Sequence, residues 1–209
     1  MTASKPQIRS LFATPLCVHF VPIAHDVNTE LRPLILAKVQ NEGGSGHGQG
    51  IYIKDDLRVW GNHHADTLFT VVSDLADALT ASRAGARVKT DWKITARACI
   101  RAKGEYQEVA ARPGAFWSGV YYVDDGYAKS DDEALGGAVE LGDPRGPLPA
   151  MTAPHLSFRM PGGQSAGFTE IVRPQTGMIL LHPSWLPRGE RRYDGDGQRL
   201  TIEFELALP

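Results

Sequence analysis

The sequence predicts a mainly β fold of the α+β class, in which two N-terminal helices cover a sandwich or barrel of strands. Two observations predict it. Apolar residues recur at helical spacing up to about residue 86, whereas residues 87–209 alternate in short segments separated by turn-forming Gly, Pro and Asp. The chain has 209 residues, the length of one large domain or two small ones, and we expect a single domain over 1–209.

The N-terminal part, residues 1–86, is expected to supply one strand and two helices that pack on the barrel. Residues 8–22 are extended and apolar but contain a proline, as edge strands do. Asp26 or Asn28 can cap a first helix, which ends at the Gly-rich stretch 43–50 and carries its apolar face on Leu31, Leu34, Ile35 and Val39. That stretch lacks the Gly-Lys-Ser/Thr ending of a phosphate-binding loop, so we interpret it as a flexible connection.

A second helix is predicted over residues 66–84. Its apolar side carries Leu68, Val71, Val72, Leu75 and Leu79. The preceding segment 62–66 (Asn-His-His-Ala-Asp) could offer two imidazoles and a carboxylate to a metal, but adjacent histidines on an extended chain point to opposite faces. We therefore favour Asp66 as the cap of this helix.

The β part, residues 87–209, begins with a long strand over 88–100, in which alternate residues are apolar. Short strands then follow, separated by turns, at 116–124, 137–142, 166–172, 177–182 and 198–207. Residues 143–165 contain too many prolines for a regular element, so a surface loop is expected there.

Composition and charge narrow the classes of function. With 22 Lys and Arg against 24 Asp and Glu, the formal net charge is −2, which gives no general attraction to nucleic acid or to an anionic membrane. No apolar run approaches the roughly 18–20 residues of a membrane span and no signal peptide is recognisable, so a cytoplasmic location is expected. Cys17 and Cys99 lie in apolar segments and are expected to be buried thiols.

Three segments carry a resemblance to a known family: residues 112–123 (with Ser-Gly-Val-Tyr-Tyr), 174–189 (with Pro-Ser-Trp-Leu) and 196–204 (with Arg-Leu-Thr). Together they resemble bacterial and phage 2-oxoglutarate/Fe(II) oxygenases, and their order and spacing hold over residues 90–207. The resemblance implies a double-stranded β-helix, the cupin-like jelly roll, with two covering helices.

The family's iron is held by two histidines and one further side chain. Aligned on Pro113, those ligand positions fall on Ala110, Arg112 and Arg188. Alanine has no donor atom and arginine stays protonated, so neither can coordinate Fe(II), and we expect no metal ligand at these positions. His182 is the nearest substitute ligand, although a lone histidine in an apolar strand is more often a hydrogen-bonded core residue.

The resemblance also assigns residues to the 2-oxo acid. Arg199 stands where the family's closing strand carries the arginine that binds the distal carboxylate of 2-oxoglutarate, with Thr201 in the Arg-x-Ser position and Tyr122 as a weaker candidate. Arg199 could instead pair with an acid such as Glu203 or Asp194. The aromatic residues Trp117, Tyr121 and Trp185 lie in the matched segments and could line a pocket or belong to the core.

If the resemblance fixes the geometry, Arg112 and Arg188 face the space that the metal ion occupies in the family, and His182 lies nearby. Such arginines need acceptors, which a bound anion or acids such as Glu108, Glu190 and Glu203 could provide. The leading hypothesis is a degenerate oxygenase without a metal, whose pocket binds a small carboxylate or phosphate, 2-oxoglutarate among them. An active hydroxylase with noncanonical ligands and a structural or protein-interaction domain are the alternatives. A homodimer through segment 8–22 is a further candidate.

Overall fold

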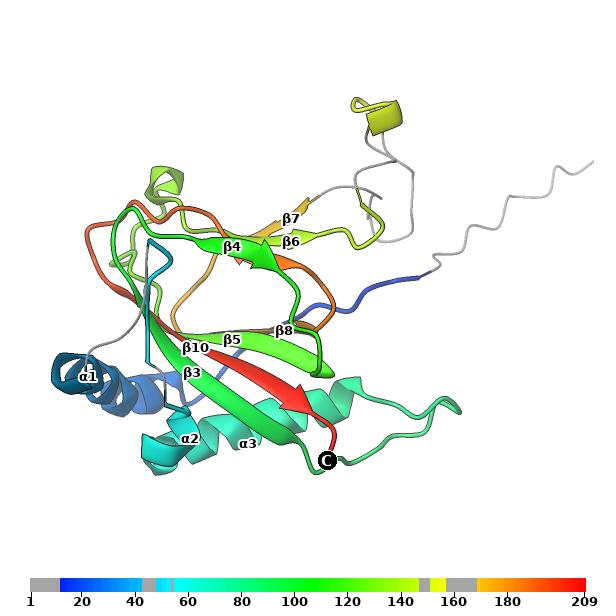
Figure 1. Cartoon of the computed structure of the whole chain (residues 1–209), viewed down its shortest axis with the longest axis horizontal. Coiled ribbons are helices and arrows are strands. Elements are labelled where there is room, and N and C mark those ends of the chain that lie inside the picture. The colour runs from blue at the N-terminus through cyan, green and yellow to red at the C-terminus, as the bar shows by residue number, and fades with distance from the viewer. Residues whose placement is uncertain (1–11, 43–47, 54, 147–150, 157–168) are drawn as a thin grey trace, which may run out of the picture.

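Two stacked antiparallel sheets form the body of the protein, and helices cover the outer face of the larger sheet (Figure 1). The computed structural model describes residues 12–42, 48–53, 55–146, 151–156 and 169–209. The larger sheet has the order β1-β8-β5-β10-β3-β2, formed by Cys17–Phe20, Met178–Pro183, Trp117–Asp124, Arg199–Ala207, Lys93–Arg101 and Ile51–Tyr52. The smaller sheet has the order β4-β9-β6-β7, formed by Gln107–Ala110, Arg188–Glu190, Val139–Gly142 and Thr169–Val172. This is the jelly-roll arrangement that the resemblance implied.

The helices are α1 (Ala24–Glu42), the short α2 (Leu57–Trp60) and α3 (His63–Leu79), with a 3-10 turn at Glu133–Leu135. The predicted caps were wrong for both long helices. Helix α1 already begins two residues before Asp26, and α3 is capped by Asn62, whose Oδ1 accepts the backbone N–H of His64 at 3.0 Å. Asp66 lies in the first turn of α3. The second helix also ends earlier than predicted, because a β-bridge joins Ala81 to Arg87.

Two apolar cores lie on opposite faces of the larger sheet. The first fills the space between that sheet and the helices, with Leu31 and Ile35 of α1 and Leu68 and Val72 of α3. The second lies between the two sheets and consists of Val120, Tyr122, Val139, Leu141, Met178, Leu180 and Leu186. This second core occupies only part of the space between the sheets, and charged side chains occupy the rest.

The strand predictions were confirmed in kind but not in every boundary. The long strand begins at Lys93 rather than at residue 88, and β2, β4 and β9 were not predicted. Strand β1 lies at the edge of the larger sheet, as expected. Cys99 is buried, but Cys17 is only partly so, which corrects the expectation for that thiol.

Parts of the predicted segments 8–22, 43–50, 143–165 and 166–172 lie outside the described residues. None of the helices in the described part of the chain is long and apolar enough to cross a membrane.

Candidate functional site

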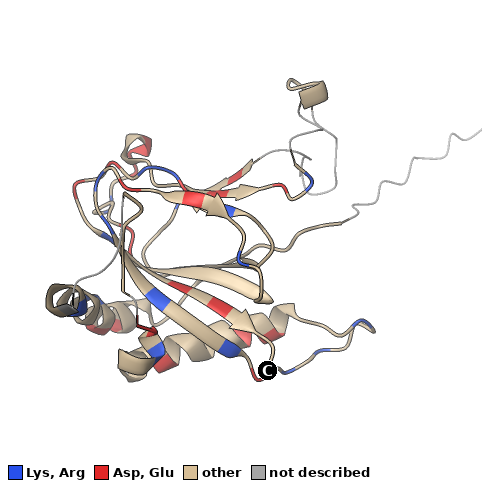
Figure 2. Cartoon of the chain, viewed as in Figure 1, with Lys and Arg blue, Asp and Glu red and all other residues tan. Residues whose placement is uncertain are grey.

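Charged side chains line the face of the larger sheet that looks toward the smaller one. Alternate residues of a strand point to opposite faces, so Leu200 and Ile202 of β10 pack in the core beneath the helices. Arg199, Thr201 and Glu203 therefore point between the sheets, as the alternation predicted. Figure 2 shows basic positions along β3 beside acidic positions along β10.

Glu203 is the most heavily bonded carboxylate on this face. Its Oε1 accepts hydrogen bonds from Arg101 Nη2 at 3.0 Å and from Tyr52 Oη at 3.2 Å, and its Oε2 accepts one from Gln107 Nε2 at 3.3 Å. Burial alone would raise the pKa of Glu203, but the positive charges of Arg188 and Arg101 outweigh it and lower that pKa to about 2. Glu203 is therefore ionised at neutral pH.

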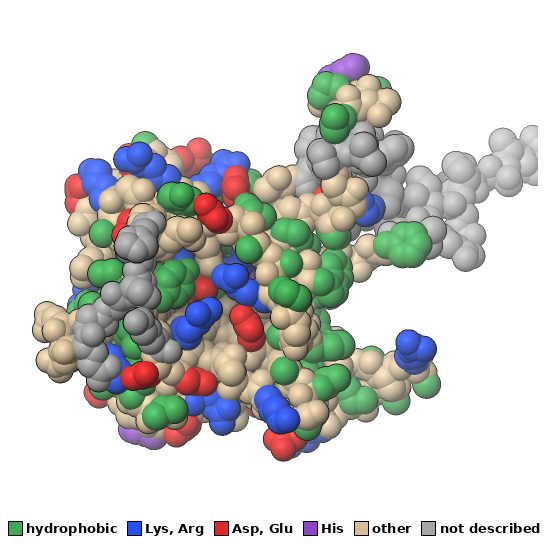
Figure 3. Space-filling model, in the orientation of Figure 1, with side chains coloured by type: hydrophobic (Ala, Val, Ile, Leu, Met, Phe, Trp, Pro, Cys, Tyr) green, Lys and Arg blue, Asp and Glu red, His purple; other side chains and the backbone are tan. Residues whose placement is uncertain are grey.

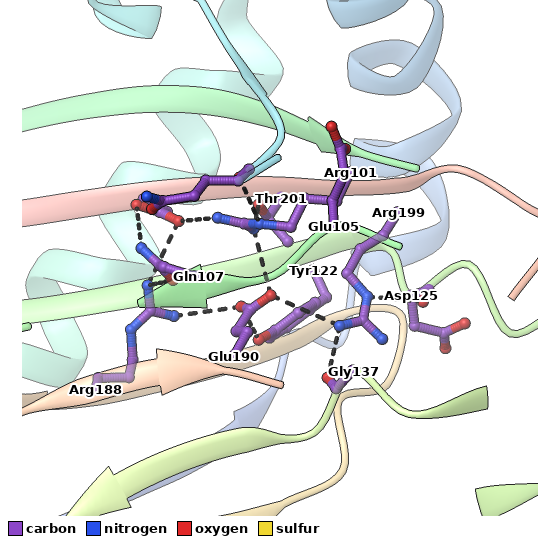
Figure 4. A network of polar contacts seen from close by, with 12 residues as sticks. Arg101, Glu105, Gln107, Tyr122, Asp125, Gly137, Arg188, Glu190, Arg199 and Thr201 are labelled. Carbon is purple, nitrogen blue, oxygen red and sulfur yellow. Dashed lines mark hydrogen bonds and ion pairs between the residues drawn. The ribbon is translucent and has the colours of Figure 1, made fainter. Parts of the chain in front are cut away.

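Glu190 reaches the same network from the smaller sheet (Figure 4). Its Oε1 accepts a 2.7 Å hydrogen bond from Tyr122 Oη, and its Oε2 lies 3.3 Å from Arg101 Nη1 and 3.6 Å from Arg199 Nη1. Burial opposes ionisation, yet the charges of Arg101, Arg199 and Arg188 hold the pKa of Glu190 below its ordinary value. The Glu190 side chain is thus a charged link between the two sheets.

Arg188 bridges the two buried glutamates. Its Nη2 donates to Gln107 Oε1 at 2.9 Å and lies 3.5 Å from Glu203 Oε1, while its Nη1 lies 3.5 Å from Glu190 Oε1. The expectation that the arginines pair with acids is therefore confirmed for Glu190 and Glu203. Glu108, the third acid considered, is exposed.

Arg199 is fully buried in an aromatic cage. Its guanidinium carbon lies 4.7 Å from the ring centre of Tyr193, 4.9 Å from that of Tyr127 and 5.9 Å from that of Tyr122. Its Nε donates to the carbonyl oxygen of Asp125, and its Nη1 to that of Gly137 at 2.6 Å. Its Nη2 has no hydrogen-bond partner in the described part of the chain.

The alternative considered for Arg199, a pair with an acidic side chain, is observed, but the acid is Glu190 rather than Glu203 or Asp194. Thr201 is equally buried, and its Oγ1 accepts a long 3.4 Å hydrogen bond from Arg101.

His182 is buried on β8, and its Nδ1 lies 2.9 Å from the carbonyl oxygen of Pro183. Burial, together with the positive charges of Arg188 and Arg112, lowers the pKa of His182 to about 4. The imidazole is neutral at pH 7 and adds no positive charge for an anion. Among the described residues its Nε2 has no hydrogen-bond partner.

A cavity of about 260 Å³ opens beside this network. The charged residues that line it are Arg97, Arg112 and Arg188 with Asp56, Glu203 and Glu205, and Thr95 and Ser118 add hydroxyl groups. Figure 3 shows basic and acidic side chains side by side in the hollow between the two sheets. Arg199, Thr201, Tyr122 and His182 are not part of its lining.

Besides the exposed Arg97, Arg112 is open to solvent in this cavity, with a third of its side chain exposed. Its Nη2 lies 3.9 Å from Glu203 Oε2, and its Nε lies 3.8 Å from Glu205 Oε1. Both distances exceed those of hydrogen bonds. The guanidinium of Arg112 therefore has N–H groups available to donate to a ligand in the cavity.

The aromatic residues of the matched segments have structural places. Tyr121 faces α1 and donates a 2.7 Å hydrogen bond to Asn28, and Trp117 donates one to Thr80. Trp185 is half exposed.

Three residues of the network, Arg101, Gln107 and Tyr52, were not predicted from the sequence. A signal for Arg101 was present, because it directly follows the apolar alternation of its strand. A buried arginine at that position requires acids opposite it.

The comparisons identify the family. The pattern of the protein family described as "Putative 2OG-Fe(II) oxygenase" matches residues 97–205, just over half of the chain. The chain belongs to this family. No curated protein sequence matches it.

Solved structures of 2-oxoglutarate/Fe(II) oxygenases share the fold. A prolyl-4-hydroxylase from Pseudomonas putida is 13% identical with a TM-score of 0.60, and the match covers 94% of this chain and 92% of that one. A prolyl hydroxylase from Trichoplax adhaerens, solved with a hypoxia inducible factor peptide, is 13% identical with a TM-score of 0.62 over 92% and 83% of the chains. HygX from Streptomyces hygroscopicus, solved with nickel and 2-oxoglutarate, is 14% identical with a TM-score of 0.58 over 93% and 83%. These likenesses establish the double-stranded β-helix fold.

The residues that the resemblance places at the family's ligand positions do not fit Fe(II). Ala110 on β4 lies opposite Arg188 on β9, so the structure does bring two of the three positions together. Neither side chain can donate an electron pair to a metal ion. The nearby Glu190 and Glu203 are held by arginines, and no group of three His, Cys, Asp or Glu residues in the described ranges could hold a metal.

Proposed function

We propose that this member of the oxygenase family has no iron chemistry and binds a small carboxylate or phosphate in the cavity beside Arg112. The observation that carries the proposal is the state of Arg112, a partly exposed guanidinium whose nearest described carboxylate oxygens lie beyond hydrogen-bond distance. A guanidinium presents N–H donors in a fork that matches a carboxylate or phosphate.

The other charges in the cavity are compatible with an anion. Asp56 already accepts the backbone N–H groups of Arg58 and Ala96. Glu203 has its charge compensated by Arg101 and Arg188. Glu205 is the remaining acid, and a ligand anion would compete with it for Arg112.

Isothermal titration calorimetry tests this proposal with inorganic phosphate, succinate and 2-oxoglutarate, each with and without Fe(II). We expect at least one anion to bind without iron, and Arg112→Ala to weaken that binding tenfold or more. Arg191→Ala is the matched control, because Arg191 is an exposed arginine that pairs with Glu140 away from the cavity. Binding that needs Fe(II), or iron retained by protein purified without chelator, would instead support an active hydroxylase.

A structural or interaction domain is the second candidate, and one observation favours it: the buried arginines Arg101, Arg188 and Arg199 all have internal carboxylate partners. Under this candidate none of the three anions produces heat with the wild-type protein. That result would refute anion binding at Arg112.

A further inference from the structure

We propose that the side-chain carboxylate of Glu190 occupies the carboxylate-binding position formed by Arg199 of β10 and Tyr122 of β5, so no free carboxylate binds there. This position is called the seat below. These residues lie in the part of the space between the sheets that protein side chains fill. This occupancy does not depend on anion binding at Arg112, whose cavity does not include these residues.

The register of the larger sheet creates the need for this carboxylate. Arg199 of β10 pairs directly with Arg101 of β3, so two guanidinium groups leave neighbouring strands on the same face. Like charges directly opposite one another destabilise a sheet, and both side chains are buried. Glu190 Oε2 lies 3.3 Å from the Arg101 guanidinium and 3.6 Å from that of Arg199, which places one negative charge between the two positive ones.

The second oxygen completes the seat. Glu190 Oε1 accepts the Tyr122 hydroxyl at 2.7 Å and lies 3.5 Å from Arg188 Nη1. The resemblance assigned an arginine on the closing strand, and more weakly a tyrosine on β5, to a carboxylate, and here both contact a carboxylate that the chain itself supplies. A free carboxylate could take this place only by leaving Glu190 charged and unpaired in the interior, which is strongly unfavourable.

Protein atoms also enclose the guanidinium of Arg199. Gly137 has φ +69°, and a Cβ atom added to it would lie 2.5 Å from Arg199 Nη2. The rings of Tyr127 and Tyr193 cover the same guanidinium. The space around Arg199 is therefore filled by protein atoms rather than left for a ligand.

Chemical rescue tests the inference. Glu190→Ala removes the atoms of one acetate ion, and the variant should be strongly destabilised in chloride and stabilised by added acetate at equal ionic strength. Unfolding in urea is followed by tryptophan fluorescence. At acetate a hundredfold above its Kd, the ratio of folded to unfolded variant should rise about a hundredfold.

Three proteins serve as controls. The wild type and Glu190→Gln, in which side-chain atoms still fill the seat, should not respond to acetate. Glu140→Ala removes a partly exposed glutamate on β6 that pairs with Arg191, and it too should show no response.

Two results would overturn the inference. One is a Glu190→Ala protein that refolds no better in acetate than in chloride, including one that refolds in neither. The other is 2-oxoglutarate binding to the wild type that Tyr122→Phe weakens while Arg112→Ala does not. If only Arg112→Ala loses anion binding, the result concerns the cavity beside Arg112. It does not contradict the proposed role of Glu190.

Discussion

Replacing Glu203 by glutamine removes one buried negative charge and keeps the shape of the side chain. Arg101 Nη2 lies 3.0 Å and Arg188 Nη2 lies 3.5 Å from the Glu203 oxygen that would lose its charge. Removing one partner of a buried ion pair costs about 3–5 kcal/mol, because the remaining charges stay in the interior without compensation. The pKa gives a similar magnitude.

The pKa of Glu203 falls from an ordinary value of 4.5 to about 2 in the folded protein. At about 1.4 kcal/mol per unit, ionisation of this carboxylate contributes roughly 3 kcal/mol to the free energy of unfolding. The folded pKa is the lower one, so the contribution is complete above pH 4.5 and declines as the pH falls toward 2. At pH 3 about 1 kcal/mol should remain.

The measurement is urea unfolding of the wild type and Glu203→Gln at pH 7, 5 and 3, followed by circular dichroism. The difference in unfolding free energy should be largest at pH 7 and should shrink by about 2 kcal/mol at pH 3. Glu205→Gln is the matched control on the same face of β10, because Glu205 is a third exposed and lies 3.8 Å from Arg112. Equal effects of the two substitutions at pH 7, or a difference that does not change with pH, would refute the reasoning.

Two further pairs of variants test other contacts of the network. Tyr122→Phe should cost about 1.5–3 kcal/mol, because the hydroxyl bonds a charged acceptor, whereas Tyr121→Phe, which loses a bond of equal length to a neutral amide, should cost about 1 kcal/mol. Thermal unfolding of the two variants checks the order, and the reverse order would contradict it. Gly137→Ala should cost about 3 kcal/mol, from positive φ plus the clash with the buried guanidinium. Gly146→Ala, with φ +78° and open space around it, should cost about 1 kcal/mol; equal losses would show that the guanidinium can move aside.

The fold was predictable where hydrophobic periodicity is strong. The apolar side of α3 and the alternation of β3 and β10 are plain in the sequence, and both patterns correspond to real elements. The strands β4 and β9 were missed because they are short and carry Gln107, Glu108, Arg188 and Glu190. Hydrophobic patterns cannot reveal a strand whose buried residues are charged.

The site was predictable in its residue types but not in its pairings. Arg188 and Arg199 were singled out by resemblance, and Glu190 and Glu203 were named as partners for buried arginines. Which acid meets which arginine depends on register and on the stacking of the two sheets. Arg101 and Glu190 are 89 residues apart in the chain, a relation that no local pattern encodes.

The bridging position of Arg188 limits how a metal site could be introduced between the two sheets. The single substitution Arg188→His would remove the cation that Glu190 and Glu203 share. It would add one possible metal ligand but leave the charges of both glutamates poorly compensated. The same holds for changes at Arg101 and Arg199. Because each charge of the network depends on the others, substitutions in this interior are coupled, and a route to an iron site would have to change several residues together.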